Sequence, residues 1–282
     1  MQNTGKLRGK TIFITGASRG IGEAIAIKCA KDGANIVIAA KSAEPHPKLE
    51  GTIYTAADKI EEAGGKALPC IVDVRYEEQI QSAIEKAVSK FGGIDIVINN
   101  ASAINLSGTD DLDVKRYDLM QNINTRGSFL VSKLCLPYLK KSPHAHILNL
   151  SPPLEMKPKW FAPHVGYTIS KYGMSMLVLG MTEEFKSFNI AVNALWPRYG
   201  VQTAALDMLA SKESGNYARK PEIMADAAYA ILVKDPRHPK SSGNFFIDDE
   251  VLECEGVTDF DQYCVDPANR DQLIEDFFVS KL

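Results

Sequence analysis

Short apolar runs alternate with segments of helical periodicity along most of the chain. The apolar runs are rich in β-branched residues and continuous rather than alternating, which is typical of strands buried on both faces of a parallel sheet. Gly64-Gly65 and Gly92-Gly93 end two of the helical segments, as glycine often does after a helix. The pattern predicts strands at 11–14, 35–40, 67–72, 95–98, 145–150 and 244–248, and helices at about 52–63, 77–91 and 113–141, the last bent near Pro137.

This order predicts a single α/β domain, because no Pro-rich or Ser-rich linker interrupts it. We expect a doubly wound Rossmann-type domain over residues 1–250, with a parallel sheet of about seven strands and helices on both faces. The composition shifts to Met, Ala, Ser, Lys and Gly at about 198–221, which indicates a substrate lid. Residues 251–282 are expected to form an acidic, irregular C-terminal tail.

Composition and charge exclude several classes of function. Of the 282 residues, 45% are hydrophobic and 24% charged, which is typical of a globular protein with a sizeable core. The net charge of -3 gives no electrostatic reason to expect binding to nucleic acid, and no apolar run is long enough to span a membrane. The five cysteines are scattered without a CxxC pair, so we expect neither a metal site nor a disulfide framework.

A glycine-rich turn joins the first predicted strand to a helical pattern. Its glycines permit a tight turn and let backbone N–H groups and the helix N-terminus approach a pyrophosphate. A purely structural strand-to-helix turn is the alternative, but the flanking strand and helix occur in the order that a dinucleotide site requires. The residues expected to bind the cofactor here are Gly16, Ala17, Ser18, Arg19, Gly20, Ile21 and Gly22.

The end of the second strand indicates which nicotinamide cofactor is bound. Enzymes that select NAD place a carboxylate here to bind the ribose hydroxyls, whereas this chain has Ala40 and Lys41, with Arg19 in the glycine turn. Two cations and no acid suit the additional phosphate of NADP(H), although each cation alone could be a solvated surface charge. Asp73 follows the third strand, at the edge where open α/β sheets bind ligands.

Tyr167 and Lys171 are the candidate proton-transfer pair. Four residues apart on a helix, they lie on the same face. A phenol loses its proton near pH 10, and a neighbouring cation lowers that pKa. The sequence therefore predicts a tyrosine able to exchange a proton near neutral pH. An ordinary solvated helix face shows the same spacing, so the spacing alone does not identify a catalytic pair. The other motifs of the chain must support that interpretation.

Together these motifs resemble the classical short-chain dehydrogenase/reductase family, in its order and spacing, over roughly residues 9–250. Within the family, three segments look most like the hydroxysteroid dehydrogenase-like branch: Ser151-Pro152-Pro153, Trp160-Phe161 and 194–197. Members of that branch often carry a sterol-carrier-type domain, which we do not expect within these 282 residues. The residues that carry the resemblance are Thr15, Gly16, Gly20, Gly22, Asp73, Asn99, Asn100, Ala101, Asn124, Tyr167, Lys171, Asn193 and Pro197.

The resemblance implies a role for each matching position. Tyr167 would protonate a substrate carbonyl oxygen as hydride arrives, or act as the base in the reverse oxidation. Lys171 would lower the pKa of Tyr167 and bind the nicotinamide ribose, and Asn124 would hold a water that links Lys171 to solvent. Asn100 would lie near a cofactor ribose, Asp73 at the adenine, and Thr203 at the nicotinamide amide or the pyrophosphate.

The catalytic serine of the family is missing from its usual place. It normally follows the fifth strand, thirteen residues before the tyrosine, where this chain has Leu154. Alignment on the strand end puts Pro152 at that position and Ser151 one residue early, and proline has no side-chain donor. Ser151 could donate the hydrogen bond to the substrate oxygen if the loop is shifted by one residue. Thr168, Ser170 or a backbone N–H are the alternative donors.

The resulting expectation is an NADP(H)-dependent oxidoreductase that interconverts an alcohol and a carbonyl, on a lipid-derived or acyl-CoA substrate. The alternatives are an enoyl- or dienoyl-CoA-type C=C reductase and an NADP-binding regulatory protein with little turnover. Ser280-Lys281-Leu282 ends the chain as a peroxisomal address, which implies a peroxisomal import receptor as a partner. By resemblance we also expect a homodimer or homotetramer.

Overall fold

The fold is organised around one seven-stranded parallel sheet. The structure is a computed structural model in which residues 1–47, 49–209 and 212–279 are described. The strand order is β3-β2-β1-β4-β5-β6-β7, so the direction of sheet building reverses between β1 and β4. In open α/β sheets, ligands bind at the carboxyl ends of the strands beside this reversal. The strands are β1 (Thr11–Thr15), β2 (Asn35–Ala40), β3 (Lys66–Ile71), β4 (Ile96–Asn99), β5 (His146–Asn149), β6 (Ala191–Trp196) and β7 (Phe245–Ile247).

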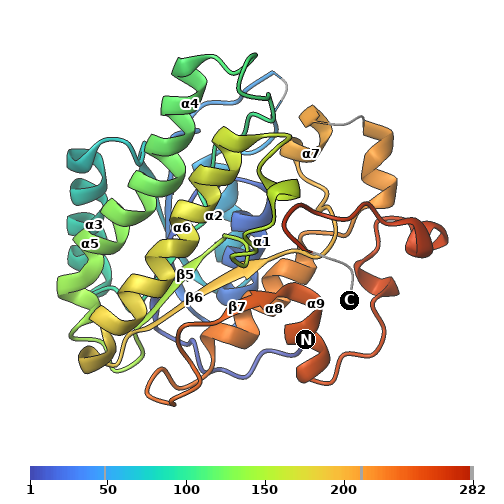
Figure 1. Ribbon diagram of the computed structural model, residues 1–282. Helices are drawn as coiled ribbons and strands as arrows, with labels where there is room; N and C mark the ends of the chain where they lie inside the picture. Colours follow the sequence, from blue (N-terminus) through green and yellow to red (C-terminus); the bar gives the residue numbers. More distant parts are fainter. Residues whose placement is uncertain (48, 210–211, 280–282) are drawn as a thin grey trace.

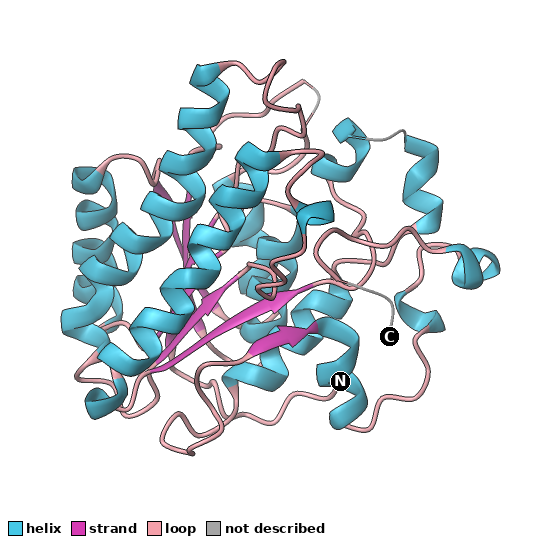
Figure 2. Cartoon of the chain, viewed as in Figure 1, coloured by secondary structure: helices cyan, strands magenta, loops and turns pink. Residues whose placement is uncertain are grey.

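Helices cover both faces of the sheet, and this confirms the predicted doubly wound Rossmann-type fold (Figures 1 and 2). They are α1 (Gly20–Ala30), α2 (Ile53–Glu62), α3 (Glu77–Phe91), α4 (Val114–Met120), α5 (Ser128–Leu139), α6 (Val165–Glu184), α7 (Ala204–Leu209), α8 (Glu222–Leu232) and α9 (Asp248–Cys254). No helix within the described ranges has the length and apolarity needed to cross a bilayer.

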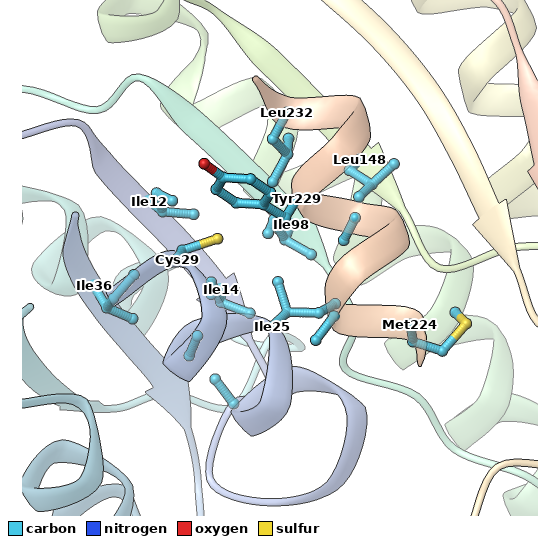
Figure 3. Close-up of a cluster of buried hydrophobic side chains, with 14 of the residues drawn as sticks. Ile12, Ile14, Ile25, Cys29, Ile36, Ile98, Leu148, Met224, Tyr229 and Leu232 are labelled. Atoms are coloured by element: carbon cyan, nitrogen blue, oxygen red, sulfur yellow. The ribbon is translucent and has the colours of Figure 1, made fainter. Parts of the chain in front are cut away.

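Successive residues of each strand point into two different cores. Ile12 and Ile14 face the core formed with α1, α2 and α8, whereas Phe13 faces the core formed with α3, α5 and α6. Figure 3 shows the first core, where Ile25 of α1 and Tyr229 of α8 pack against the sheet. Because successive residues face opposite sides of the sheet and both sides are buried in a core, the strands are apolar at consecutive positions.

A π-helical turn interrupts the long helix that the sequence predicted at 113–141. Residues Gln121–Gly127 form this turn between α4 and α5. π-turns inside α-helices are rare and concentrate at functional sites. Pro137 lies within α5.

The C-terminal segment is more ordered than an irregular tail. α9 crosses the expected boundary at residue 250, and Phe278 is buried in the same cluster as Tyr167 and Trp196. Backbone hydrogen bonds fix this segment to the predicted lid, from Gly200 N to Ile274 O (2.8 Å) and from Asp276 N to Arg198 O (2.9 Å). In Figure 1 the red C-terminal segment accordingly returns towards the middle of the molecule.

Candidate functional site

The glycine turn between β1 and α1 has the geometry of a dinucleotide-binding turn. Gly16 and Gly20 have φ angles of +68° and +59°, which glycine adopts without steric cost. A Cβ atom at Gly22 would lie 2.5 Å from Nδ2 of Asn100, so no side chain fits there. Asn100 Nδ2 donates hydrogen bonds to Thr15 O (3.0 Å) and Gly16 O (3.1 Å) and so holds the turn in place. The turn therefore leaves room for a pyrophosphate at the N-terminus of α1.

The two cations predicted for the cofactor phosphate lie in different environments. The Arg19 guanidinium donates to the backbone oxygens of Glu50 (2.7 Å) and Gly51 (2.6 Å), which fixes it across the loop after β2. Lys41 is exposed at the end of β2. Its ammonium is close enough to Asp73 to help lower the pKa of that carboxyl.

Asp73 lies at the carboxyl end of β3, but its carboxylate already has a protein partner. Arg75 donates to both of its oxygens, with Nε–Oδ1 at 2.9 Å and Nη2–Oδ2 at 2.6 Å. This hydrogen bonding is the main reason why the pKa of Asp73 is lowered. The Asp73 side chain is thus a rigid acceptor, and an adenine contact there stays a prediction.

A cavity of about 370 Å³ opens beside the glycine turn. It brings together five residues for which the sequence predicted a part in cofactor binding or catalysis, namely Ile21, Asn100, Tyr167, Lys171 and Thr203. Most of the remaining wall is apolar and comes from the loops after β4 and β6, from α7 and from the C-terminal segment: Ile104, Leu106, Val201, Ala205, Leu206, Leu209, Ile274 and Phe277. An apolar cavity with a few converging polar groups is the usual form of a small-molecule site.

Tyr167 and Lys171 are both buried at this cavity, so they do not belong to a solvated helix face. Lys171 Nζ donates to Leu150 O (2.7 Å) and lies 5.0 Å from the centre of the Trp196 ring. Burial lowers the pKa of Lys171 to about 7, against an opposing contribution from Asp276.

The pKa of Tyr167 is raised, which corrects the expectation that it would be lowered. Burial of the phenol is the larger cause, and the nearby Asp276 carboxylate is the second. The four-residue spacing suggested that the Lys171 charge would lower this pKa, but the spacing contains no information about desolvation, which is the main cause of the shift. In the ligand-free cavity Tyr167 is consequently a protonated phenol, the form required of a proton donor.

Asn124 lies in the π-turn and joins two walls of the site. Its Oδ1 accepts from Ala103 N (2.8 Å), and its Nδ2 donates to Ala103 O (2.9 Å) and Ser170 Oγ (2.9 Å). Asn124 thereby fixes the loop after β4 to the helix that carries Tyr167. Its expected role in holding a water stays a prediction.

Ser151 does not contact the cavity. Its Oγ is fully buried and has no hydrogen-bond partner among the described residues. The two alternative hydroxyls are already engaged, since Thr168 Oγ1 donates to Trp160 O (2.6 Å) and Ser170 Oγ donates to Tyr167 O (2.7 Å). The structure therefore gives no support for the re-registered loop in which Ser151 would replace the family serine.

We expect Ser151→Ala to leave kcat within about threefold and to raise the free energy of unfolding by up to about 1 kcal/mol. The reason is that a buried hydroxyl without a partner carries a desolvation cost that alanine avoids. Urea denaturation and steady-state kinetics measure the two quantities. A loss of kcat beyond about 100-fold at unchanged stability would show that Ser151 takes part in the reaction.

The C-terminal segment forms part of the cavity wall, which the sequence did not indicate. Glu275, Asp276 and Phe277 line the cavity, and Trp196 Nε1 donates to Phe277 O (2.8 Å). Phe278 is 1% exposed. It packs against the rings of Trp160, His164, Tyr167, Tyr172 and Trp196. In the sequence, only the adjacent phenylalanines Phe277 and Phe278, in an otherwise acidic segment, indicated that this segment could pack against the domain.

Comparisons with known proteins agree with this geometry. The family model described as short chain dehydrogenase matches residues 10–214. Hydroxysteroid dehydrogenase-like protein 2 of Danio rerio is 64% identical over 280 residues, and that of Homo sapiens is 62% identical over 282 residues. These matches cover 99% and 100% of this chain but 66% of each relative, so the chain spans slightly less than two thirds of their length.

A solved structure extends the similarity to three dimensions. The crystal structure of a short chain dehydrogenase from Mycobacterium thermoresistibile is 49% identical, with a TM-score of 0.91, and the match covers 98% of this chain and 96% of that one. Sequence, fold and the arrangement of Tyr167, Lys171 and the glycine turn thus agree. The chain belongs to the short-chain dehydrogenase/reductase family, whose members are oxidoreductases that bind nicotinamide cofactors.

Proposed function

We propose that the protein is an NADP(H)-dependent oxidoreductase that interconverts an alcohol and a carbonyl on an apolar, lipid-derived or acyl-CoA substrate. The observation that carries this proposal is the burial of Tyr167 and Lys171 together in an apolar cavity beside the glycine turn. The aliphatic wall from α7 and the C-terminal segment supports an apolar substrate.

The residues of the site fit a dinucleotide. Gly20 and Gly22 leave the approach to the N-terminus of α1 open, and Asn100, directly after the neighbouring strand β4, holds the turn. Thr203 lies against the same turn, because a Cβ atom at Gly20 would be 3.4 Å from its methyl group. The cofactor, when bound, supplies or accepts the hydride.

The protein's own residues manage the substrate oxygen and its proton. In the direction of reduction, the Tyr167 phenol gives its proton to the carbonyl oxygen as the hydride reaches the carbonyl carbon. Lys171, with Nζ held by Leu150 O, is placed to stabilise the phenolate that remains. The apolar wall excludes water from the reacting atoms.

NADP(H) is proposed over NAD(H) because β2 ends at Ala40 and is followed by Lys41, without a carboxylate. We expect Lys41→Ala to weaken NADPH binding about fivefold and NADH binding less than twofold, since one exposed ion pair with a phosphate contributes about 1 kcal/mol. Titration of cofactor fluorescence measures both constants. Lys31→Ala, at the opposite end of α1, is the matched control. Equal effects on the two cofactors would contradict the proposal.

A C=C reductase is the second candidate, and the position of Ser151 away from the cavity favours it. The substrate test is turnover with NADPH on a panel of long-chain ketones, 3-ketoacyl-CoA and enoyl-CoA thioesters. Oxidation of NADPH with ketones supports the leading proposal, and oxidation only with enoyl thioesters supports the second. Tight NADPH binding with no turnover on any compound would support the regulatory alternative and sink both enzyme proposals.

Peroxisomal localisation is also a proposal, resting on Ser280-Lys281-Leu282, which lies outside the described residues. Binding of the purified protein to a peroxisomal import receptor, lost on deletion of these three residues, tests it.

A homodimer or homotetramer is proposed from exposed apolar side chains on α5 and α6. Sedimentation at micromolar concentration tests this proposal. The side chains are Phe129, Ile169, Met176 and Leu179, which are 43%, 43%, 52% and 51% exposed.

A further inference from the structure

We propose that Asp276, as a neutral carboxylic acid, donates a hydrogen bond to the substrate oxygen beside Tyr167. It thereby performs the task that the resemblance assigned to the family's serine, since Ser151 does not line the cavity. The inference rests on the proposed carbonyl chemistry and deepens it, because it identifies the group that polarises the carbonyl. It also gives the C-terminal segment a direct part in the reaction.

The position of Asp276 supports this role. Asp276 lines the same cavity as Tyr167 and Lys171, and its charge acts on the pKa of both. The backbone holds it firmly, since Asp276 N donates to Arg198 O (2.9 Å) and Phe277 N donates to Asp276 Oδ1 (2.7 Å). A side chain fixed in this way needs little reorganisation when charge develops on the substrate.

Other polar side chains of the cavity have different tasks. Asn100 holds the glycine turn through Nδ2, and Thr203 Oγ1 accepts from Leu206 N (3.4 Å) at the start of α7. Ser102 Oγ donates to the adjacent Ala103 O (3.5 Å). Lys171 is bound to Leu150 O. Asp276 is an acid that lines the cavity and whose charge also acts on Tyr167 and Lys171.

The surroundings of Asp276 favour its protonated form. Burial is the largest influence and Asp248 of α9 adds to it, against the opposing effects of the Phe277 N–H, Lys171 and the Trp196 indole. Together they raise the pKa of Asp276 to about 7. At and below neutral pH much of the population thus carries a carboxylic O–H, which can donate one hydrogen bond while the other oxygen accepts one. A carboxylate could not donate.

The reaction balances without a further co-reactant. Hydride from NADPH forms the new C–H bond, the electron pair of the C=O π bond moves to oxygen, and oxygen takes the proton of Tyr167. Asp276 keeps its own proton and lowers the energy of the developing oxyanion. The products are the alcohol and NADP⁺, and solvent returns a proton to Tyr167.

Two substitutions separate this role from a structural one. Asp276→Leu removes the donor, so at pH 6 we expect kcat for ketone reduction to fall about 100- to 1000-fold, as for other lost oxyanion donors. Asp276→Asn keeps an N–H donor, so we expect its kcat within about 10-fold of wild type and a smaller loss of activity between pH 6 and pH 8. Part of that loss remains, because Lys171 titrates in the same range. Asp271→Asn, with a side chain 92% exposed in the same segment, is the control.

A spectroscopic measurement gives a readout that does not depend on turnover. With NADP⁺ bound, the infrared carbonyl band of methyl nonyl ketone is expected to move to lower frequency in wild type and Asp276→Asn, and less in Asp276→Leu. An unchanged band in Asp276→Leu, or equal kcat losses in the two variants, would overturn the inference. If wild type shows the band shift but reduces no ketone, the proposed function fails while the Asp276 contact stands.

Discussion

Replacing Tyr167 by phenylalanine is expected to lower kcat for carbonyl reduction by about 100- to 10,000-fold, the usual contribution of a general acid. Phenylalanine keeps the ring that packs 5.9 Å from His164 and 6.2 Å from Phe278, so only the hydroxyl is lost. NADPH affinity should stay within about twofold, because the proton is transferred after the cofactor is bound. Stopped-flow reduction at saturating NADPH measures the chemical step, and fluorescence titration measures the affinity.

Tyr54→Phe is the matched control, because Tyr54 lies on α2 with 51% of its surface exposed. We expect no change in kcat for that variant. A Tyr167→Phe enzyme with wild-type kcat on ketones would show that another group protonates the substrate. Retained activity on enoyl thioesters alone would instead favour the C=C reductase.

Phe278→Ala is expected to lower the free energy of unfolding by about 3–5 kcal/mol, or to release the C-terminal segment if that requires less energy. Phe278 is 1% exposed, and its ring centre lies 5.3 Å from that of Tyr172 and 5.9 Å from that of Trp196. Its φ of +71° is unfavourable for a residue with a side chain, so the aromatic packing must outweigh that cost. Released residues would also withdraw Asp276 from the cavity, so kcat should fall as well.

Urea denaturation followed by tryptophan fluorescence measures the loss, because Trp160 and Trp196 both contact Phe278. Limited proteolysis separates local release from global unfolding, since release exposes the segment while the sheet stays protected. Phe188→Ala, at a site 40% exposed, is the control and should cost less than about 1 kcal/mol. An unchanged urea midpoint in Phe278→Ala would show that the C-terminal segment is not part of the folded core.

The fold could be predicted from the sequence because its signals are local. Continuous β-branched runs, glycines at the turns and helical periodicity each depend on a few neighbouring residues, and the parallel seven-stranded sheet follows from their order. The glycine turn and the Tyr167–Lys171 spacing are local signals too, and the structure places both at one cavity. The π-turn at Gln121–Gly127 was missed, because it continues directly from α4 into α5 and its sequence has only one apolar side chain, that of Ile123.

Tertiary structure alone decided the chemistry around Tyr167. The direction of its pKa shift depends on burial, which no four-residue spacing contains. Ser151 is excluded from the cavity by the path of the loop after β5. Asp276 lies 109 positions after Tyr167 in the sequence and reaches it because Phe278 packs into the aromatic cluster. The sequence by itself thus determined the sheet, the glycine turn and the proposed proton-transfer pair, whose signals are short-range. Long-range packing determined which groups surround them.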